Sequence, residues 1–321
     1  MLRVEQVNIY PVKGMQAATH DGGGEIEGLH ATNIGMFHAH GVRDRELFVA
    51  AEADNGDSLT FVSARGWGTP QGPRMTHPND SRLASVEVDI SATAELTLSA
   101  KGVGRLILWV HDSLRAAGPQ EVGMHGGKLW GYDMGRDAAD YVSEVIGRPA
   151  RIMAIDYGKP RIASGGRHKK ALAADGHGYL VTSQESLDEL NRLNEDAPDV
   201  PMNRYRPNIV VDSFGSPFSE YKVKGFDIVR ASFTVAGASS RCAGTNVDIH
   251  GERVGGGLRV LRPQRGIELD GAGQPIEGSE NVFFGINANS ARNDAELGRL
   301  VMLGDVVTVN DFQSWPHFQP T

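Results

Sequence analysis

The single cysteine of the chain, Cys242, is the residue whose type points most directly to chemistry. It follows Arg241 and precedes a run of small and polar residues that ends at Asp248. A cysteine beside a cation and backbone N–H groups is kept as a thiolate, which acts as a nucleophile or as a soft metal ligand. A lone cysteine is also among the residues most often buried for structural reasons. The local sequence leaves both alternatives open.

Arginines and hydroxyls near the ends of expected strands and helices supply a second kind of chemistry, the binding of anions. Arg43 and Arg45 flank Asp44 just before an apolar strand, and Asp44 could orient one guanidinium group toward a phosphate. The same cluster also fits an ordinary solvated strand end. Other segments place a cation, a hydroxyl or a helix N-terminus in comparable positions: Lys13, Thr182 with Ser183, and Arg206 with Asn208.

The composition excludes several classes of protein. One cysteine in 321 residues cannot support a disulfide framework, an internal iron–sulfur cluster or a cysteine-rich zinc site. The formal charge of −8 argues against a general nucleic-acid or anionic-membrane binder. No apolar run reaches the roughly 20 residues of a membrane helix, and the first residues lack the apolar core of a signal peptide. We therefore expect a cytoplasmic protein with no membrane or nucleic-acid partner.

The elements that must position these residues are mostly strands. Forty glycines and short alternating apolar runs predict an antiparallel sheet or barrel rather than βαβ units. Residues 136–146 carry apolar residues at helical spacing before Gly147, and a second helix follows Thr182, which fits a capping box with Glu185. Strands are expected at residues 4–12, 84–90, 94–100, 105–110, 209–211, 228–235 and 258–261.

Five segments taken together carry a family resemblance. They are residues 9–14 (Ile-Tyr-Pro-Val-Lys-Gly), 43–45, 180–191, 204–211 and 241–248, and residues 283–285 and 303–307 add a closing pattern. In this order they resemble the MOSC family, named after the C-terminal domain of molybdenum cofactor sulfurases. The branch with an N-terminal β-barrel domain, which includes the mitochondrial amidoxime-reducing component and its bacterial relatives, is the more similar one.

The resemblance implies a fold of the α/β class that is β-rich and of α+β type. An N-terminal MOSC β-barrel-like domain over residues 1–120 would pack on a MOSC β-barrel with flanking helices over residues 121–321. The second domain would bind the molybdenum cofactor (molybdopterin).

The resemblance also implies roles for single residues. Cys242 would be the thiolate ligand of molybdenum, since a soft sulfur suits that metal. Arg241 would keep the thiol deprotonated and count among the cofactor-binding residues. Apart from the resemblance, the position of Asp248 after Cys242 suggests that it orients or tunes groups near the cysteine in catalysis, with turn capping as an equal alternative. The pterin and its phosphate would be held by Lys13, Arg45, Thr182, Ser183, Arg206 and Asn208.

The activity implied by the family is two-electron reduction at molybdenum. The substrate would be an N-hydroxylated or N-oxide-type small molecule, and a separate donor protein of ferredoxin, flavodoxin or cytochrome type would supply electrons. The basic loop 159–170 is a candidate docking surface for an acidic donor. At family level the domain is also associated with pyridoxal phosphate binding. The alternatives are a non-catalytic cofactor carrier or storage protein and a β-barrel binding protein without metal.

Two positions depart from the family pattern, and one histidine pair stands outside it. Asp248 is followed by Ile249 where relatives usually have proline, and Gly14 stands where relatives often have serine. These changes bear on substrate choice and local geometry. His38 and His40 share one face of an extended segment and could bind a metal, but the sequence indicates no third ligand, and a structural or solvated role is the alternative.

Overall fold

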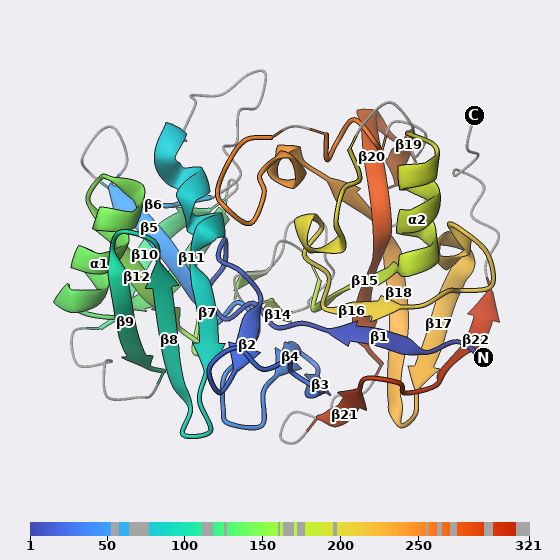
Figure 1. Cartoon of the computed structure of the whole chain (residues 1–321), viewed down its shortest axis with the longest axis horizontal. Coiled ribbons are helices and arrows are strands. Elements are labelled where there is room, and N and C mark those ends of the chain that lie inside the picture. The colour runs from blue at the N-terminus through green and yellow to red at the C-terminus, as the bar shows by residue number, and fades with distance from the viewer. Residues whose placement is uncertain are drawn as a thin grey trace.

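The protein is described by a computed structural model in which strands dominate (Figure 1). Most of the basic loop 159–170, including Lys169, lies outside the described residues, so its docking role stays a prediction. The described residues are 1–52, 58–63, 77–110, 118–124, 127–159, 161–162, 170–171, 177–194, 198–254, 256–261, 265–269, 275–291 and 298–312.

Five strands close into a barrel in the order β10–β11–β12–β5–β6, sealed by a parallel pairing of β10 with β6. Alternate residues of β5 enter two different cores: Phe48 and Ala50 join the barrel interior, while Leu47 and Val49 join the large central cluster. A strand buried on both faces is apolar throughout, which explains the composition of β5. The bounds are β5 Leu47–Glu52, β6 Leu59–Phe61, β10 Gln120–Met124, β11 Gly127–Asp133 and β12 Ala150–Ile155.

A four-stranded sheet and a helix lie beside the barrel (Figure 1). The predicted helix 136–146 is confirmed as α1 (Arg136–Ile146), whose buried face comes from its helical apolar repeat. Gly147 ends it in the left-handed conformation, φ 71°, which glycine adopts without steric cost. The strand order of the sheet is β2–β7–β8–β9. Its strands are β2 Ala18–His20, β7 Glu87–Ile90, β8 Glu95–Ala100 and β9 Gly104–Trp109, and the 3-10 helix η1 (Pro78–Ser85) precedes β7.

The other half of the molecule is an eight-stranded sheet in the order β1–β16–β15–β20–β18–β17–β22, with β19 paired to β20. The N-terminal strand β1 is its edge, and Val4 pairs with Val211. The strands are β1 Val4–Val7, β15 Tyr179–Ser183, β16 Ile209–Val211, β17 Val223–Ile228, β18 Ala231–Arg241, β19 Arg265–Leu269, β20 Pro275–Ser290 and β22 Val307–Phe312.

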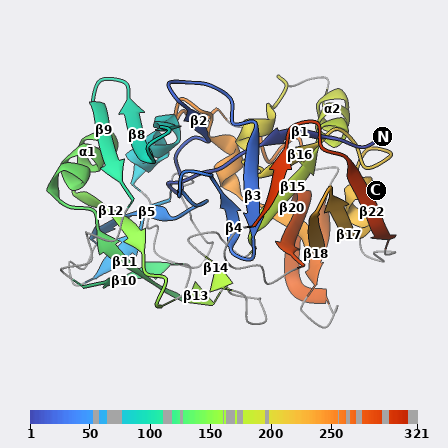
Figure 2. The same ribbon diagram turned by 90° about the horizontal axis from the view of Figure 1, so that it is seen from below.

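The N-terminal and C-terminal parts of the chain are tied together a second time. Near the C-terminus, β21 (Arg299–Met302) pairs with β3 (Gly28–Thr32), which pairs with β4 (Gly35–Phe37). Figure 2, seen from below, shows β3 and β4 of this small sheet between the two halves. A two-stranded pair, β13 (Arg161–Ile162) with β14 (Lys170–Ala171), completes the strands. The predicted β-rich fold with an N-terminal barrel is confirmed, whereas the division at residue 120 stays a prediction.

Several local predictions are wrong; the strand expected over residues 4–12, for example, ends at Val7. The run 228–235 is interrupted because Val229 adopts a left-handed φ of 51°, so β17 ends at Ile228 and β18 starts at Ala231. Residues 258–261 form a turn rather than a strand. The cap of α2 (Gln184–Arg192) is Ser183, one residue after Thr182, because the Ser183 hydroxyl accepts the Ser186 N–H.

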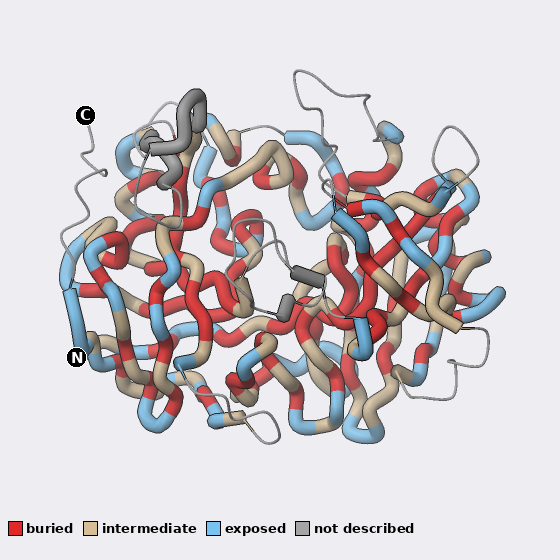
Figure 3. The backbone as a smooth tube through the Cα atoms, turned by 180° about the vertical axis from the view of Figure 1, so that it is seen from behind, coloured by how far each residue is buried: buried red, intermediate tan, exposed pale blue. Residues whose placement is uncertain are grey.

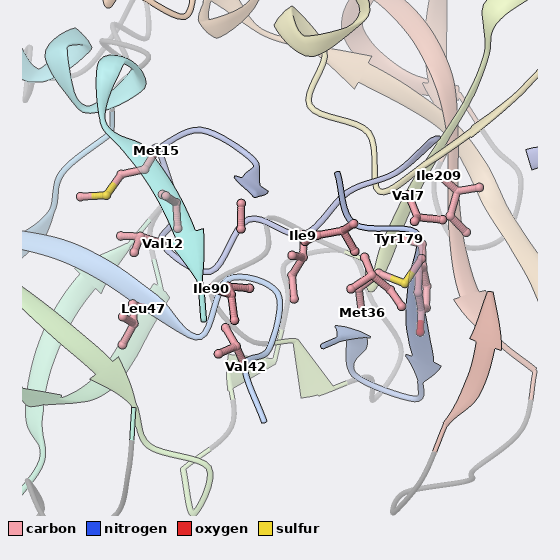
Figure 4. Close-up of a cluster of buried hydrophobic side chains, with 14 of the residues drawn as sticks. Val7, Ile9, Val12, Met15, Met36, Val42, Leu47, Ile90, Tyr179 and Ile209 are labelled. Atoms are coloured by element: carbon pink, nitrogen blue, oxygen red, sulfur yellow. The ribbon is translucent and has the colours of Figure 1, made fainter. Parts of the chain in front are cut away.

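The two halves share one continuous apolar core. Figure 3 shows buried chain running through both halves and through the segment between them. In Figure 4 the labelled side chains form a row from Val12 and Leu47, at the barrel, through Ile9 to Tyr179 and Ile209 of the large sheet. Ile9, Val12 and Leu47 are fully buried. The segment between β1 and β2 is therefore fixed by packing on both sides, and this segment also carries Tyr10 and Lys13.

Candidate functional site

Cys242 lies at the end of β18, where the strand gives way to the short 3-10 helix η5 (Ala243–Asn246). Its backbone is extended, with φ −111° and ψ 176°. Its carbonyl oxygen accepts both the N–H and the hydroxyl of Thr245, each at 3.1 Å. These bonds fix the backbone of the cysteine, whose side chain is half-buried and not in a disulfide.

The Arg241 guanidinium donates hydrogen bonds to a main-chain oxygen and to a hydroxyl oxygen. Its Nη2 donates to the Tyr205 carbonyl oxygen at 2.6 Å, and its Nη1 donates to the Ser239 hydroxyl at 3.1 Å. The Tyr205 ring centroid lies 6.0 Å from the guanidinium carbon. The Arg241 guanidinium is thus anchored, next in sequence to Cys242.

Two predicted cofactor residues meet on one aromatic ring. The guanidinium carbon of Arg206 lies 4.4 Å from the centroid of Tyr10, and that of Arg45 lies 5.1 Å from the same centroid. Both distances fall within the range of cation–π attraction. Tyr10 is buried, and burial raises the pKa of its hydroxyl to about 12, against the opposing effect of Arg206, Arg45 and Arg241. The phenol is therefore neutral, and Arg45 and Arg206 lie over its ring.

Asp44 pairs with Arg45, while the predicted orientation of an arginine toward a phosphate stays a prediction. Its Oδ2 is paired with the Arg45 guanidinium, and its Oδ1 accepts the N–H of Tyr10 at 2.8 Å. The Asn208 side chain completes the group: its Oδ1 accepts the Leu180 N–H at 3.1 Å and the Arg45 Nη1–H at 3.4 Å. Residues from four separate segments therefore converge here.

The remaining predicted residues lie around this group in less accessible positions. Lys13 is buried, with its ammonium nitrogen 5.1 Å from the Phe61 ring centroid. Thr182 and Ser183 are fully buried. Their hydroxyls have protein partners, since Thr182 Oγ1 contacts the Met202 sulfur at 3.3 Å and Ser183 caps α2. The structure thus brings Arg45, Arg206 and Asn208 together, and gives the two hydroxyls structural contacts.

Asp248 has a turn-capping role in this structure. Its Oδ1 accepts the N–H of His250 at 2.8 Å and the N–H of Glu252 at 2.9 Å. The turn-capping alternative is therefore observed, while the catalytic role stays a prediction.

A cavity of about 150 Å³ lies between these segments. Tyr10, Arg206 and Asp248 contribute to its wall, and so does Ile249 at the position where the family pattern has proline. The sequence did not identify Gln16, whose Nε2 donates to the Ile249 carbonyl oxygen at 3.0 Å and so joins the N-terminal segment to the cysteine loop. The lining residues are Gln6, Asn8, Tyr10, Gly14, Gln16, Ala17, Ala84, Asn203, Arg204, Arg206, Pro207, Gly244, Val247, Asp248 and Ile249.

Comparison with known protein families identifies the family of the chain. Residues 1–149 match the MOSC N-terminal beta barrel domain, and residues 168–308 match the MOSC domain. The chain belongs to the MOSC family. The first matched range contains the barrel strands β5, β6, β10 and β11, and the second contains Cys242. Because β1 pairs with β16, the MOSC sheet is completed by a strand from the N-terminal range.

One curated relative and one solved structure are similar to the chain. The chain is 29% identical over 263 residues to mitochondrial amidoxime-reducing component 1 of Mus musculus, covering 76% of this chain and 65% of that protein. It thus spans about two thirds of the length of that relative. A solution structure of a Bordetella bronchiseptica protein is 25% identical and covers 34% of this chain and 71% of its own, with a TM-score of 0.23, too low to carry an argument.

The histidine pair lies in a cluster of three rings outside the MOSC motifs. The structure adds His20 to His38 and His40, with ring centroids 5.0 to 5.5 Å apart. Burial and the neighbouring imidazoles lower the pKa of His38 to about 4. Within the residues described here, no three ligand side chains are arranged to hold a metal, and no helix is long and apolar enough to cross a membrane.

Proposed function

We propose that the protein is a molybdenum-cofactor-dependent oxidoreductase that reduces N-hydroxylated or N-oxide-type small molecules. The observation that carries this proposal is that Arg45 and Arg206 lie over the Tyr10 ring, while Arg241, next in sequence to Cys242, is held by Tyr205 and Ser239. Guanidinium groups gathered from separate segments favour an anionic ligand, because their planar donors match the oxygens of a phosphate. Membership of the MOSC family and the similarity to an amidoxime-reducing component support the same proposal.

The chemistry of the donor set fits the molybdenum cofactor. A half-buried thiol at a strand end offers one soft ligand, and the arginines and Asn208 offer donors to a phosphate and a pterin. Molybdenum, when bound, would supply the two-electron step and the oxygen-atom acceptor. Thr182 and Ser183 would take part through the main chain at the start of α2, since their hydroxyls have protein partners.

Each residue of this chain has a definite task in the proposed reaction. Arg241, held by Tyr205 and Ser239, would keep the Cys242 sulfur anionic. The apolar wall of the cavity, which includes Val247 and Ile249, would exclude water from the reacting group. Asp248 would fix the loop that follows the cysteine, through its bonds to His250 and Glu252.

The similarity to an amidoxime-reducing component favours an enzyme over a cofactor carrier or storage protein. The cavity next to Arg206 and Asp248 lies at the residues assigned to the cofactor, so it fits both functions.

Metal analysis of the purified full-length chain tests cofactor binding. We expect about one molybdenum per chain from a host that makes the cofactor, and loss of the metal in Cys242→Ser. Reduction of an N-hydroxylated amidine with an artificial electron donor then separates a reductase from a carrier. A molybdenum-free protein from a competent host would contradict the proposal, and a loaded but inactive protein would leave the carrier function.

The electron donor is proposed to be a separate acidic protein, and the location of the enzyme is proposed to be the cytoplasm. Reversing the charges of Lys169 and Lys170 should slow turnover that depends on the donor protein while leaving turnover with an artificial donor unchanged. Equal slowing with both donors would contradict a docking role. Fractionation of cells of the source organism tests the location, which is of interest because the named relative is mitochondrial.

A further inference from the structure

Tyr10 connects the segments that carry the proposed anion-binding arginines. Its N–H donates to Asp44 Oδ1 at 2.8 Å, and its carbonyl oxygen accepts the N–H of Arg45 at 2.8 Å. Its hydroxyl donates to the Pro207 carbonyl oxygen at 3.2 Å. One residue therefore fixes the backbone of the Asp44–Arg45 segment and of the segment that follows Arg206.

The two arginines reach the Tyr10 ring from an unusual backbone conformation. Arg45 has φ 52° and Arg206 has φ 56°, in the left-handed region that residues other than glycine seldom adopt. Such a conformation costs free energy and persists where surrounding contacts determine it. Both side chains then lie over the same ring, at 5.1 and 4.4 Å from its centroid.

The attraction comes from the ring face and not from a tyrosinate charge. Burial keeps the hydroxyl protonated, since it raises the pKa of Tyr10 to about 12. A neutral aromatic ring attracts a guanidinium group through its quadrupole. Such a ring can therefore restrain two cations without adding a negative charge of its own. By contrast, Asp44 pairs with Arg45 through its charge.

We propose that Tyr10 is a positioning residue that holds Arg45 and Arg206 as a preorganised pair for a phosphate group. The inference rests on the proposed function for the identity of the ligand, a phosphate ester of the cofactor. Its physical basis is that an arginine confined over the ring spends more of its time in the conformation that binds the anion. When the competent fraction falls, the apparent dissociation constant rises in proportion.

The test changes the negative charge density on the face of the ring at position 10 while keeping the shape of the side chain nearly constant. Tyr10 is replaced by phenylalanine and by phenylalanines carrying one, two or three ring fluorines, which weaken the negative ring face. The full-length chain is produced in a host that lacks the cofactor, and its affinity for inorganic pyrophosphate is measured by calorimetry, together with Tm. The same variants from a competent host are analysed for molybdenum.

We expect pyrophosphate affinity to fall stepwise along the series, by about three- to tenfold between the phenylalanine and trifluorophenylalanine variants. Tm should differ between tyrosine and phenylalanine, because the bond to Pro207 is lost, and then stay nearly constant. A purely structural role for Tyr10 would change Tm alone. Pyrophosphate affinity that is unchanged or tighter along the fluorinated series would overturn the inference.

Tyr141→Phe is the matched control. Tyr141 is buried on α1 and its hydroxyl has no hydrogen-bond partner among the described residues. Removing that hydroxyl should leave pyrophosphate affinity unchanged. If the wild-type chain binds pyrophosphate with the expected ring dependence but never carries molybdenum, the positioning role stands and the proposed cofactor is wrong.

Discussion

Removing the charge of Asp44 should destabilise the protein and make its stability depend on bound phosphate. The Asp44 side chain is 2% exposed and its partner Arg45 is 13% exposed, so the pair is largely desolvated. Breaking a buried pair by removing one partner costs about 3 kcal/mol or more, because the remaining charge is left uncompensated. Asp44→Asn should therefore lower the free energy of unfolding by about 3 kcal/mol.

A second variant distinguishes the contributions of the two Asp44 carboxylate oxygens to stability. Asparagine keeps an oxygen that accepts the Tyr10 N–H, whereas alanine does not. Asp44→Ala should therefore lose about 1 kcal/mol more than Asp44→Asn. Inorganic phosphate should restore part of the loss in Asp44→Asn, by about 1.4 kcal/mol at ten times its dissociation constant. Urea unfolding with and without phosphate measures these values.

Asp80 provides the matched control. Its fully buried carboxylate forms a two-point pair with Arg148, at 3.1 and 3.0 Å, away from the arginine cluster. Asp80→Asn should lose a similar amount of stability, and phosphate should stabilise it only as much as it stabilises the wild type. Phosphate at the same concentration should stabilise Asp44→Asn more, because Arg45 has then lost its carboxylate partner. The reasoning is refuted if Asp44→Asn unfolds within 0.5 kcal/mol of the wild type, roughly the effect of an ordinary surface change, or if phosphate stabilises Asp44→Asn no more than it stabilises Asp80→Asn.

Three further predictions concern pH and packing. Since the pKa of His38 is lowered to about 4 in the folded state, the unfolded chain takes up the proton first, and stability is lost as pH falls from about 6.5 toward 4. His38→Gln should remove this loss, which is at most about 1.4 kcal/mol per pH unit, and unfolding at pH 7 and 5 measures it. Burial raises the pKa of Glu220 to about 7, so the unfolded chain releases the proton first and stability is lost as pH rises from about 4.5 to 7. Glu220→Gln should flatten this window in the same titration, and an unchanged slope would contradict the assignment. In Gly257→Ala the new Cβ would overlap the Thr245 carbonyl oxygen, so we expect a lower Tm and weaker molybdenum retention. Gly102→Ala is the control: Gly102 has a positive φ, but no atom lies within 4 Å of the new Cβ. It therefore measures the cost of the backbone conformation without the overlap.

The local parts of the fold could be predicted from the sequence. The helix 136–146 follows from apolar residues that repeat within eleven positions and from a glycine that ends it. Local patterns failed where two neighbouring residues competed for one role, as Thr182 and Ser183 did for the cap of α2. They also failed at Val229, where a β-branched residue in a left-handed turn contradicts its own preference.

The chemistry of the site was likewise partly local. Asp44 and Arg45 are neighbours in sequence, so their pairing could be anticipated from residue types. The role of Arg241 beside Cys242 stays a prediction. The role of Tyr10 could not be anticipated, because an aromatic residue in an apolar run is indistinguishable from core until its partners are known. The family motif at residues 9–14 includes Tyr10, but it does not reveal which side chains lie over the Tyr10 ring.

The sequence by itself determined the residue types of the site, the β-rich class and the family to which the chain belongs. Tertiary structure alone decided that Arg45 and Arg206, 161 positions apart in the numbering, share one ring, and that β1 pairs with β16. The physical reason is that propensity and periodicity act over a few residues, whereas these contacts depend on how distant strands share a core. Burial of Ile9, Val12 and Leu47 between the two halves fixes that arrangement.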